Sequence, residues 1–333
     1  MLNHGGAIRA AAGRYGIAHE QWLDLSTGIN PNGWPVSDVP AAVWQRLPED
    51  NDELERAAAT YYGSAQLLPV AGSQAALQAL PQLRKPCQVG VLTPSYAEHA
   101  HAWNRHGHSI VPITAETIEA CLASLDVLVL SNPNNPTGVW FSREVLLEWW
   151  SRLAKRDGWL VVDEAFIDAT PERSLAPHSG LPGLVILRSL GKFFGLAGAR
   201  VGFVLGPDAL LQRLRELLGP WTVSGPGRWV AIQALNDRCW QRETRRSLSY
   251  ASARLAELLS WQGLPVTGST SLFQWLLYDE AAALKENLAR QGIWVRYFDA
   301  PPSLRFGLPG SEAAWRRLTA ALQKNSAGCL TRT

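Results

Sequence analysis

The 333 residues carry a formal charge of +2, with 47% hydrophobic and 18% charged residues. This composition is typical of a globular protein and excludes a disordered one, and the length suffices for a large domain and a smaller one. Because the charge is nearly neutral and no basic run occurs, nucleic acid and anionic membranes are poor candidates for partners.

The cysteines and the N-terminal stretch favour a cytoplasmic location. Cys87, Cys121, Cys239 and Cys329 are scattered without a C-x-x-C spacing, which predicts reduced thiols and argues against a zinc site. No stretch is long and apolar enough to span a bilayer. Residues 1–16 lack the continuous apolar segment of a secretion signal.

Through the first two thirds of the chain, short apolar runs alternate with helical segments. A capping residue, helical spacing and a terminal glycine predict a helix over 53–62, and a second helix opens after the turn at 72–73. Helical stretches at 97–107, 117–124 and 142–158 separate apolar runs. These runs are residues 87–92, 109–113, 125–131, 158–164, 183–189 and 199–206. The alternation predicts an α/β fold with a mostly parallel sheet sandwiched by helices.

The texture changes near residue 237 to longer helices with fewer strands, over 245–263, 269–278 and 280–292. We expect residues 46–236 to form the large domain and residues 237–333 a smaller α+β domain. Residues 1–45 would be an N-terminal arm that joins the smaller one. Parallel sheets bind ligands beyond the carboxyl ends of their strands, so the motifs at strand ends matter most.

Residues 131–138, Ser-Asn-Pro-Asn-Asn-Pro-Thr-Gly, follow one of these apolar runs. Their composition alone fits a tight turn. The length of the stretch and its doubled Asn-Pro go beyond that explanation. Asn135 could present an amide donor to a ligand oxygen at the carboxyl end of the strand.

Asp163 ends the next apolar strand, where an unpaired carboxylate would be costly, so it needs a cationic partner. Taken alone, Asp163 is explained by helix capping. A nucleotide hydrolase also has an acidic residue after an apolar strand, but it requires G-x-x-x-x-G-K-[ST]. The Gly191-Lys192 pair is followed by Phe193 and lacks the upstream glycine, which excludes that motif.

Lys192 stands among glycines and aromatic residues in the stretch 189–203. Desolvation there would leave a neutral amine that can attack a carbonyl carbon. Ser189 and Arg200 flank it, and both side chains bind phosphate well. A ligand with an aldehyde, a protonatable ring nitrogen, a ring oxygen and a phosphate would use Lys192, Asp163, Asn135 and this pair together. That cofactor is pyridoxal phosphate.

These three motifs, in this order and at these separations, resemble those of the fold-type-I pyridoxal-phosphate enzymes, and among them the histidinol-phosphate aminotransferase branch. The resemblance covers nearly the whole chain. It implies an aspartate-aminotransferase-like fold and a homodimer with active sites at the interface. It also implies that Lys192 forms the Schiff base, that Asp163 pairs with the pyridinium nitrogen and that Asn135 binds the ring hydroxyl oxygen.

The same resemblance implies further cofactor contacts. Tyr96 would stack on the ring, and a turn with backbone N–H groups at a helix start would face the phosphate. The implied catalytic residues are Lys192 and Asp163. The implied cofactor-binding residues are Gly72, Ser73, Gln74, Tyr96, Asn135, Asp163, Ser189, Lys192 and Arg200.

Two positions depart from the aminotransferase pattern. Phe166 stands where these enzymes usually place a tyrosine that touches the ring oxygen. Leu47 stands where a tyrosine often reaches the phosphate of the neighbouring subunit's cofactor. The loss of the hydroxyl at Phe166 argues against transamination.

Residues 3–6 (Asn-His-Gly-Gly), 24–33 and 163–166 are similar to those of threonine-phosphate decarboxylases, which serve cobalamin biosynthesis. That family converts L-threonine O-3-phosphate into (R)-1-amino-2-propanol O-2-phosphate and CO2, without a metal. The resemblance implies that Arg305 and Gly28 bind the carboxylate and that Arg296 and His4 bind the phosphate. With Asn135, the implied substrate-binding residues are His4, Gly28, Asn135, Arg296 and Arg305.

Other interpretations stay open. Arg296 could be a surface arginine on a strand, and either Lys192, a tyrosine or water could return the proton to Cα. The protein could be an aminotransferase for a phosphorylated substrate such as histidinol phosphate. It could also be a cofactor-fold domain used for binding or regulation, although the complete set of Lys192, Asp163, Asn135 and Arg305 argues against this.

Overall fold

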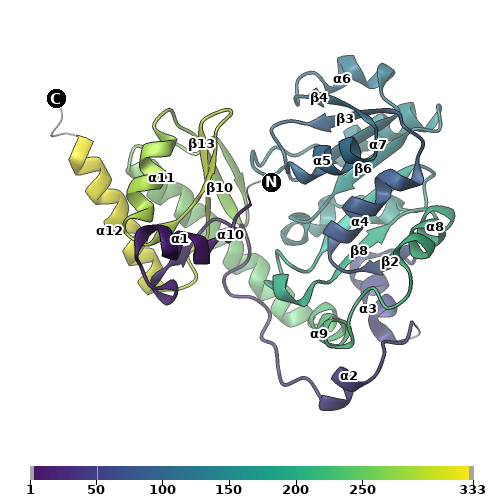
Figure 1. Cartoon of the computed structure of the whole chain (residues 1–333), viewed down its shortest axis with the longest axis horizontal. Coiled ribbons are helices and arrows are strands. Elements are labelled where there is room, and N and C mark those ends of the chain that lie inside the picture. Colours follow the sequence, from purple (N-terminus) through teal and green to yellow (C-terminus); the bar gives the residue numbers. More distant parts are fainter. Residues whose placement is uncertain (1–3, 51, 330–333) are drawn as a thin grey trace. The chain divides into compact units, whose positions relative to one another are not determined.

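The computed structural model describes residues 4–50 and 52–329, with side chains through Lys324. The chain forms two compact units (Figure 1). The smaller unit contains the described residues up to Asn32, the short segment Pro136–Gly138 and the chain from Thr244 onward. The larger unit contains Gly33–Asn135 and Val139–Glu243. The sequence predicted domain boundaries after residues 45 and 236. In the structure the corresponding boundaries between the two units lie after residues 32 and 243.

A seven-stranded sheet forms the middle of the larger unit. Its strands are, in spatial order, β2 (Leu67–Val70), β8 (Gly202–Leu205), β7 (Leu184–Ser189), β6 (Trp159–Asp163), β5 (Val127–Ser131), β3 (Gln88–Leu92) and β4 (Ser109–Ile113). The strands run parallel except β8, which is antiparallel to β7 and β2. The predicted mostly parallel sheet is therefore confirmed.

Helices cover both faces of this sheet (Figure 1). The helices of this unit are α2 (Ala41–Gln45), α3 (Glu53–Tyr62), α4 (Ser73–Ala79), α5 (Glu98–Arg105), α6 (Ile118–Cys121), α7 (Arg143–Ala154), α8 (Asp208–Leu218) and α9 (Gly225–Asn236). Side chains of α4, α5 and α8 pack on the valines of one sheet face. Helix α7 packs against β6.

The bounds of α3 match the sequence prediction at both ends. Asp52 precedes the helix, and its side chain accepts a hydrogen bond from the N–H of Leu54 at 2.9 Å. Gly63 ends the helix with a φ of 71°, a left-handed conformation that glycine adopts without strain.

Strand β2 was not predicted from the sequence. Pro69 lacks the N–H that a central strand must donate, and the run of four residues is short. Within the described residues β2 is an edge strand that pairs only with β8, so a proline is tolerated there.

The ends of several segments lie at one edge of the sheet. The parallel strands β2, β3, β5, β6 and β7 all finish at this edge. Because β8 runs the opposite way, it begins where β7 ends. The loop between β7 and β8 therefore starts and finishes at the edge where ligands bind in such sheets.

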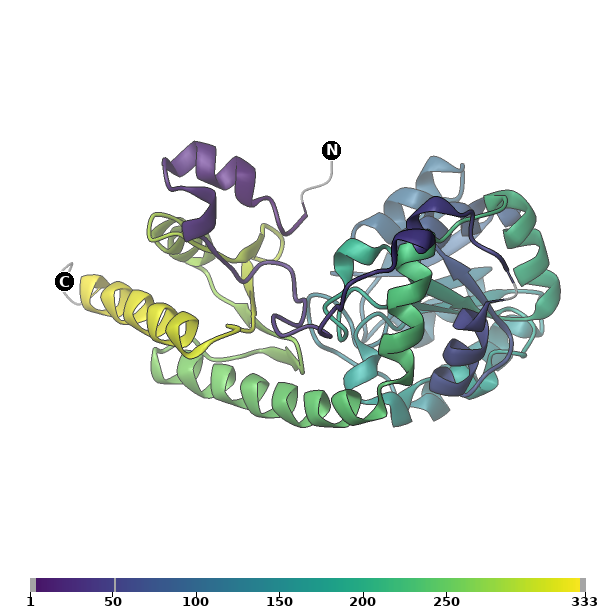
Figure 2. The ribbon, with the colours of Figure 1, turned by 90° about the horizontal axis from the view of Figure 1, so that it is seen from below.

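The smaller unit contains an antiparallel sheet of β12 (Arg296–Phe298), β13 (Ser303–Gly307), β10 (Phe273–Leu277) and β9 (Gly268–Thr270), in this order. A short parallel pair joins β1 (Leu23–Asp24) to β11 (Ile293–Trp294). Its helices are α1 (Ile8–Tyr15), α11 (Ala281–Ala289), α12 (Glu312–Cys329) and the part of α10 (Arg238–Trp261) that follows Thr244. Figure 2 shows α12 beside this part of α10, where Arg254 donates to Glu312.

Among the residues that the structure describes, no helix is long and apolar enough to cross a lipid bilayer.

Candidate functional site

One cavity of the larger unit lies at the edge of the sheet where the parallel strands end. It is lined by the predicted cofactor-binding residues, all nine of them. These residues end or follow β2, β3, β5, β6 and β7, and Arg200 precedes β8. The cavity is also lined by Ser131, Ala165, Phe166, Gly191 and Ala197. The sequence motifs therefore come together, while the role of each residue stays a prediction.

Asp163 is held by two contacts at the end of β6. Its Oδ1 atom accepts a hydrogen bond from the N–H of Ala165 at 3.0 Å, a local turn contact. Its Oδ2 atom lies 3.2 Å from Nε2 of His99, which is 1% exposed. Because Asp163 is itself only 7% exposed, this imidazole fixes the direction of a carboxylate that water hardly reaches.

Sequence reasoning did not predict His99. It lies on α5, three residues after Tyr96, and the two rings are 5.7 Å apart. Tyr96 itself precedes the helix, and its carbonyl accepts a hydrogen bond from the N–H of His99 at 3.1 Å, so the turn at the start of α5 brings the two rings together.

The asparagines after β5 have separate roles. The side chain of Asn132 donates to the carbonyl of Phe141 and accepts from its N–H. The side chain of Asn134 donates to the carbonyl of Pro94 at 2.8 Å. Asn135 lines the cavity instead. The first two asparagines brace the loop, which accounts for a stretch too long for a simple turn.

The loop that carries Lys192 is anchored by its neighbours. Phe193 and Phe194 are fully buried, and both rings pack on Trp240. The Oγ atom of Ser189 accepts the N–H of Gly191 at 3.1 Å, and a serine hydroxyl that accepts can still donate to a ligand. Lys192 stays at the cavity, with its Nζ atom 5.2 Å from the centroid of the Phe166 ring.

Gly72 and Arg200 meet at the start of α4. A Cβ on Gly72 would lie 2.6 Å from Nη2 of Arg200, and Gly72 has a φ of 75°. Arg200 also adopts a left-handed backbone, with a φ of 54°, which is uncommon for a side chain of its size. The first N–H groups of a helix have no acceptor within it, so the guanidinium and Ser73 together form a suitable place for an anion.

Tyr96 belongs to a hydrogen-bonded chain along one wall. Its hydroxyl donates to Oε1 of Gln74 at 3.1 Å, and Nε2 of Gln74 donates to Glu98 at 3.1 Å. Burial, with the nearby charges of Glu98 and Asp163, raises the pKa of Tyr96 to about 12. The phenol therefore stays protonated near neutral pH and keeps its donor role.

Two predicted substrate-binding arginines face each other in the smaller unit. Arg296 on β12 is the antiparallel partner of Arg305 on β13. Burial, and then the charge of Arg296, lowers the pKa of Arg305 to about 9. Burial also lowers the pKa of Arg296, although the carboxylate of Asp299 opposes this. Like charges directly opposite in a sheet repel, so this pair favours an anionic ligand.

The other two predicted residues of the smaller unit lie in segments next to β13. Gly28 has a φ of 61° and is two residues beyond Ser26, whose carbonyl accepts a hydrogen bond from Nη2 of Arg305. His4 is exposed and directly precedes Gly5, where a Cβ would lie 2.5 Å from the carbonyl oxygen of Ser26. His4, Gly28, Arg296 and Arg305 thus belong to one unit.

A family model described as aminotransferase class I and II matches residues 45–322. The chain belongs to the class I and II aminotransferase family.

Known proteins are similar to this chain over nearly its whole length. A threonine-phosphate decarboxylase from Pseudomonas aeruginosa is 57% identical over 97% of this chain and 97% of that protein. A threonine-phosphate decarboxylase from Sinorhizobium sp is 39% identical over 96% of this chain and 97% of that protein. The crystal structure of histidinol-phosphate aminotransferase from Sinorhizobium meliloti, in complex with pyridoxal-5'-phosphate, has a TM-score of 0.83 at 22% identity. It covers 98% of this chain and 96% of that one. The fold implied by the sequence motifs is thereby confirmed.

The cavity of this aminotransferase-family chain fits pyridoxal phosphate chemically. It offers a carboxylate for a protonated ring nitrogen, an amide for a ring oxygen and a primary amine for an aldehyde, from Asp163, Asn135 and Lys192. The absence of a Cβ at Gly72 lets the Arg200 guanidinium approach the start of α4, where it can bind a phosphate.

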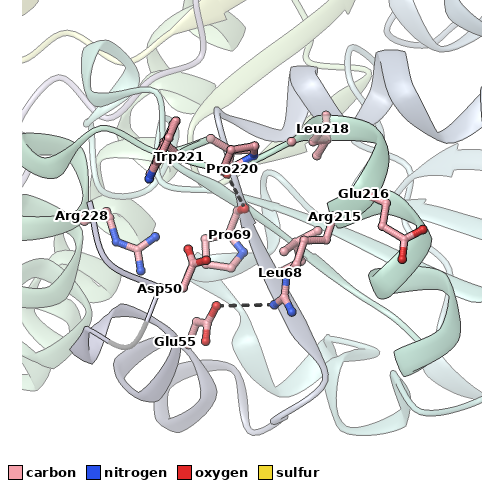
Figure 3. A pocket seen from close by; sticks show the side chains of 12 residues that line it. Asp50, Glu55, Leu68, Pro69, Arg215, Glu216, Leu218, Pro220, Trp221 and Arg228 are labelled. Carbon is pink, nitrogen blue, oxygen red and sulfur yellow. Dashed lines mark hydrogen bonds and ion pairs between the residues drawn. The ribbon is translucent and has the colours of Figure 1, made fainter. Parts of the chain in front are cut away.

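A second cavity of the larger unit contains none of the predicted residues (Figure 3). Its wall is held by an ion pair of 3.8 Å between Arg215 and Glu55 and by a hydrogen bond from Thr222 to the carbonyl of Pro69. Arg228 also lines it and pairs with Asp52, the cap of α3. The contacts of this cavity serve the packing of α3, α8 and α9.

Proposed function

We propose that this protein is a pyridoxal-phosphate-dependent decarboxylase that converts L-threonine O-3-phosphate into (R)-1-amino-2-propanol O-2-phosphate and CO2, a step of cobalamin biosynthesis. The observation that carries the proposal is the pair of Arg296 and Arg305 on adjacent strands. Threonine phosphate has a carboxylate and a phosphate, and two guanidinium groups bind such a pair of anions well. The identity of 57% to a threonine-phosphate decarboxylase supports the same substrate.

The roles of the residues follow from their chemistry. Arg305, with the backbone of Gly28, would hold the carboxylate, and Arg296, with His4, the phosphate. Bound pyridoxal phosphate supplies an electron sink for the pair of electrons that remains on Cα when the carboxylate leaves as CO2. Lys192 would link the cofactor covalently between turnovers and would carry the proton that replaces the carboxylate on Cα.

Phe166 is consistent with this reaction. It lies in the cavity and presents a ring, without a hydroxyl, to the Nζ atom of Lys192. A protonated amine near an aromatic face is stabilised, which suits a lysine that must hold a proton until Cα is ready to accept it.

We also infer that the protein works as a cytoplasmic homodimer. Trp44, Leu47 and Trp221 of the larger unit are more than half exposed, and large exposed apolar side chains often mark an interface. Cys87, Cys121 and Cys239 are free thiols, which suits a reducing compartment. Light scattering coupled to gel filtration tests the dimer, and a molar mass of one chain would reject it.

The test of the reaction is mass spectrometry of products after the cofactor-loaded protein is mixed with L-threonine O-3-phosphate in the absence of a keto acid. We expect catalytic formation of aminopropanol phosphate and CO2. Amino-group transfer from histidinol phosphate to a keto acid, without CO2 release, would instead make the protein an aminotransferase.

The matched control is Lys192→Ala. This variant should release no CO2, and borohydride should no longer fix the cofactor to the chain. If the cofactor were still fixed at another lysine, the assignment of Lys192 would be wrong.

A further inference from the structure

Ser26 connects several parts of the smaller unit. It is fully buried, and both its N–H and its hydroxyl donate to Oδ1 of Asp24, at 2.8 Å and 2.6 Å. Its Oγ atom accepts the N–H of Gly6 at 2.8 Å. Its carbonyl oxygen accepts a hydrogen bond from Arg305. One residue thus contacts both the N-terminal segment and the predicted carboxylate-binding arginine.

Gly5 and Gly6 are suited to this contact. A Cβ on Gly5 would lie 2.5 Å from the carbonyl oxygen of Ser26, closer than real Cβ contacts. Gly6 has a φ of 80°, a conformation that residues with side chains rarely adopt. The proposed function uses His4 from residues 3–6 but does not explain the two glycines, whereas the contact with Ser26 does.

Ser26 itself is held from two sides. The preceding strand β1 pairs with β11, where Asp24 is the partner of Trp294. On the other side, the N–H of Gly307 on β13 donates to the carbonyl of Leu25 at 2.7 Å. These backbone contacts fix the position of the serine. The hydrogen bond between its hydroxyl and Gly6 is therefore the link through which the N-terminal segment can respond to a ligand on Arg305.

We propose that Ser26 is a positioning residue that couples the N-terminal segment, residues 4–6, to Arg305. The inference rests on the proposed function, in which Arg305 binds the substrate carboxylate. A bound carboxylate restricts the motion of the Arg305 guanidinium, which stays hydrogen-bonded to the Ser26 carbonyl. The hydroxyl of the same serine then keeps its hydrogen bond to the N–H of Gly6. Because coupling between sites is reciprocal, an ordered segment also strengthens substrate binding.

The experiment compares Ser26→Ala with wild type as holoenzymes. The substitution removes the hydroxyl and keeps the carbonyl that Arg305 uses. We expect the KM for L-threonine O-3-phosphate to rise about 3- to 10-fold, the effect of one hydrogen bond, while kcat stays within about twofold. Amide hydrogen exchange in residues 5–8 should become faster, and L-threonine, which has the carboxylate but no phosphate for His4, should no longer slow it.

The matched control is Ser252→Ala, a buried serine of the same unit whose hydroxyl donates to Thr270. It should lower stability without changing KM or the exchange of residues 5–8. A second variant, Gly5→Ala, pushes against the Ser26 carbonyl from the other side. It displaces the N-terminal segment from Ser26 without removing the hydroxyl, and KM should rise in this variant too.

Two results would overturn the proposal: an unchanged KM in Ser26→Ala, or L-threonine that still slows exchange in residues 5–8 of that variant. Failure of the proposed function is separate, since it shows as absence of CO2 in wild type. In that case the exchange of residues 5–8 with L-threonine as the probe still decides whether carboxylate binding orders the segment. An equal response in wild type and Ser26→Ala would then reject the coupling.

Discussion

Glu164 and Arg188 form a fully buried ion pair, with 3.0 Å between Oε2 and Nη1. Glu164 directly follows Asp163 at the end of β6, and Arg188 directly precedes Ser189 at the end of β7. Arg188 also donates to Asp168, so one guanidinium serves two carboxylates. The pair therefore joins two strand ends that carry cavity residues.

We expect Arg188→Met and Glu164→Gln to differ strongly in stability. Arg188→Met leaves two buried carboxylates without their guanidinium and should lower the free energy of unfolding by about 3–5 kcal/mol. Glu164→Gln keeps an acceptor for Arg188 and should cost less than about 1.5 kcal/mol at neutral pH. Urea unfolding measures both, and a loss below about 1.5 kcal/mol for Arg188→Met would contradict the importance of the charge pairing.

The same pair predicts a pH dependence. Burial raises the pKa of Glu164 above its usual value, although Arg188 opposes this. A carboxyl whose pKa is raised by folding contributes stability that is present below pH 4.5 and is lost as the pH rises through its folded-state pKa. Glu164→Gln lacks this loss, so its stability relative to wild type should increase as the pH rises from about 4.5. A constant difference would contradict the shift.

Arg296→Gln should weaken ligand binding and raise the stability of the ligand-free protein. Removing one of two like charges on neighbouring strands relieves repulsion, so the ligand-free protein should gain about 0.5 kcal/mol. L-threonine O-3-phosphate should then raise the Tm less than in wild type, because one of its two anionic groups loses its partner. Thermal melts with and without the compound test both effects. The control is Arg290→Gln, at an exposed arginine directly after α11, and it should change neither the stability nor the shift in Tm.

Asp52→Ala should destabilise the larger unit without affecting the predicted cofactor cavity. Asp52 caps α3 and accepts two hydrogen bonds from Arg228, at 2.5 Å and 2.6 Å, and Arg228 is 5% exposed. Loss of the cap and the ion pair should cost about 3 kcal/mol. Asp52→Asn keeps the capping oxygen and should cost less. If the two variants were equally stable in urea, the capping hydrogen bond to Leu54 would contribute nothing.

The sequence predicted those parts of the site in which chemistry follows a strand end. Lys192, Asp163 and Asn135 were identified because each stands in an unusual local pattern, and the parallel sheet then brings their loops to one edge. Local patterns of this kind depend on neighbours in the chain. They are therefore visible without a structure.

Contacts between distant segments were not visible. Pro136–Gly138 belongs to the smaller unit although it lies in the middle of the sequence of the larger one. A Cβ on Gly138 would lie 2.6 Å from the N atom of Ser269, so the backbones pack closely across about 130 residues of chain. The contacts of Ser26 with Arg305 and of His99 with Asp163 also join distant segments. The residues around each of them in the sequence do not indicate which residue it will contact.

His99 offers a test of how the carboxylate of Asp163 is held. His99→Ala removes the imidazole 3.2 Å from Oδ2, and a hydrogen bond to a charged group contributes about 1.5–3 kcal/mol. We expect cofactor binding to weaken at least about tenfold, because the carboxylate loses the direction in which a protonated ring nitrogen would meet it. His99→Gln can return an N–H to the same carboxylate and should recover part of the loss.

The measurement is the dissociation constant of pyridoxal phosphate, from its absorption in titrations of the cofactor-free protein. His101→Ala is the matched control, since His101 lies on the same helix with an exposed side chain. It should bind the cofactor as wild type does. If His99→Ala did so too, Asp163 would be positioned by its contact with Ala165 alone, and the imidazole would serve only the packing of α5 on the sheet.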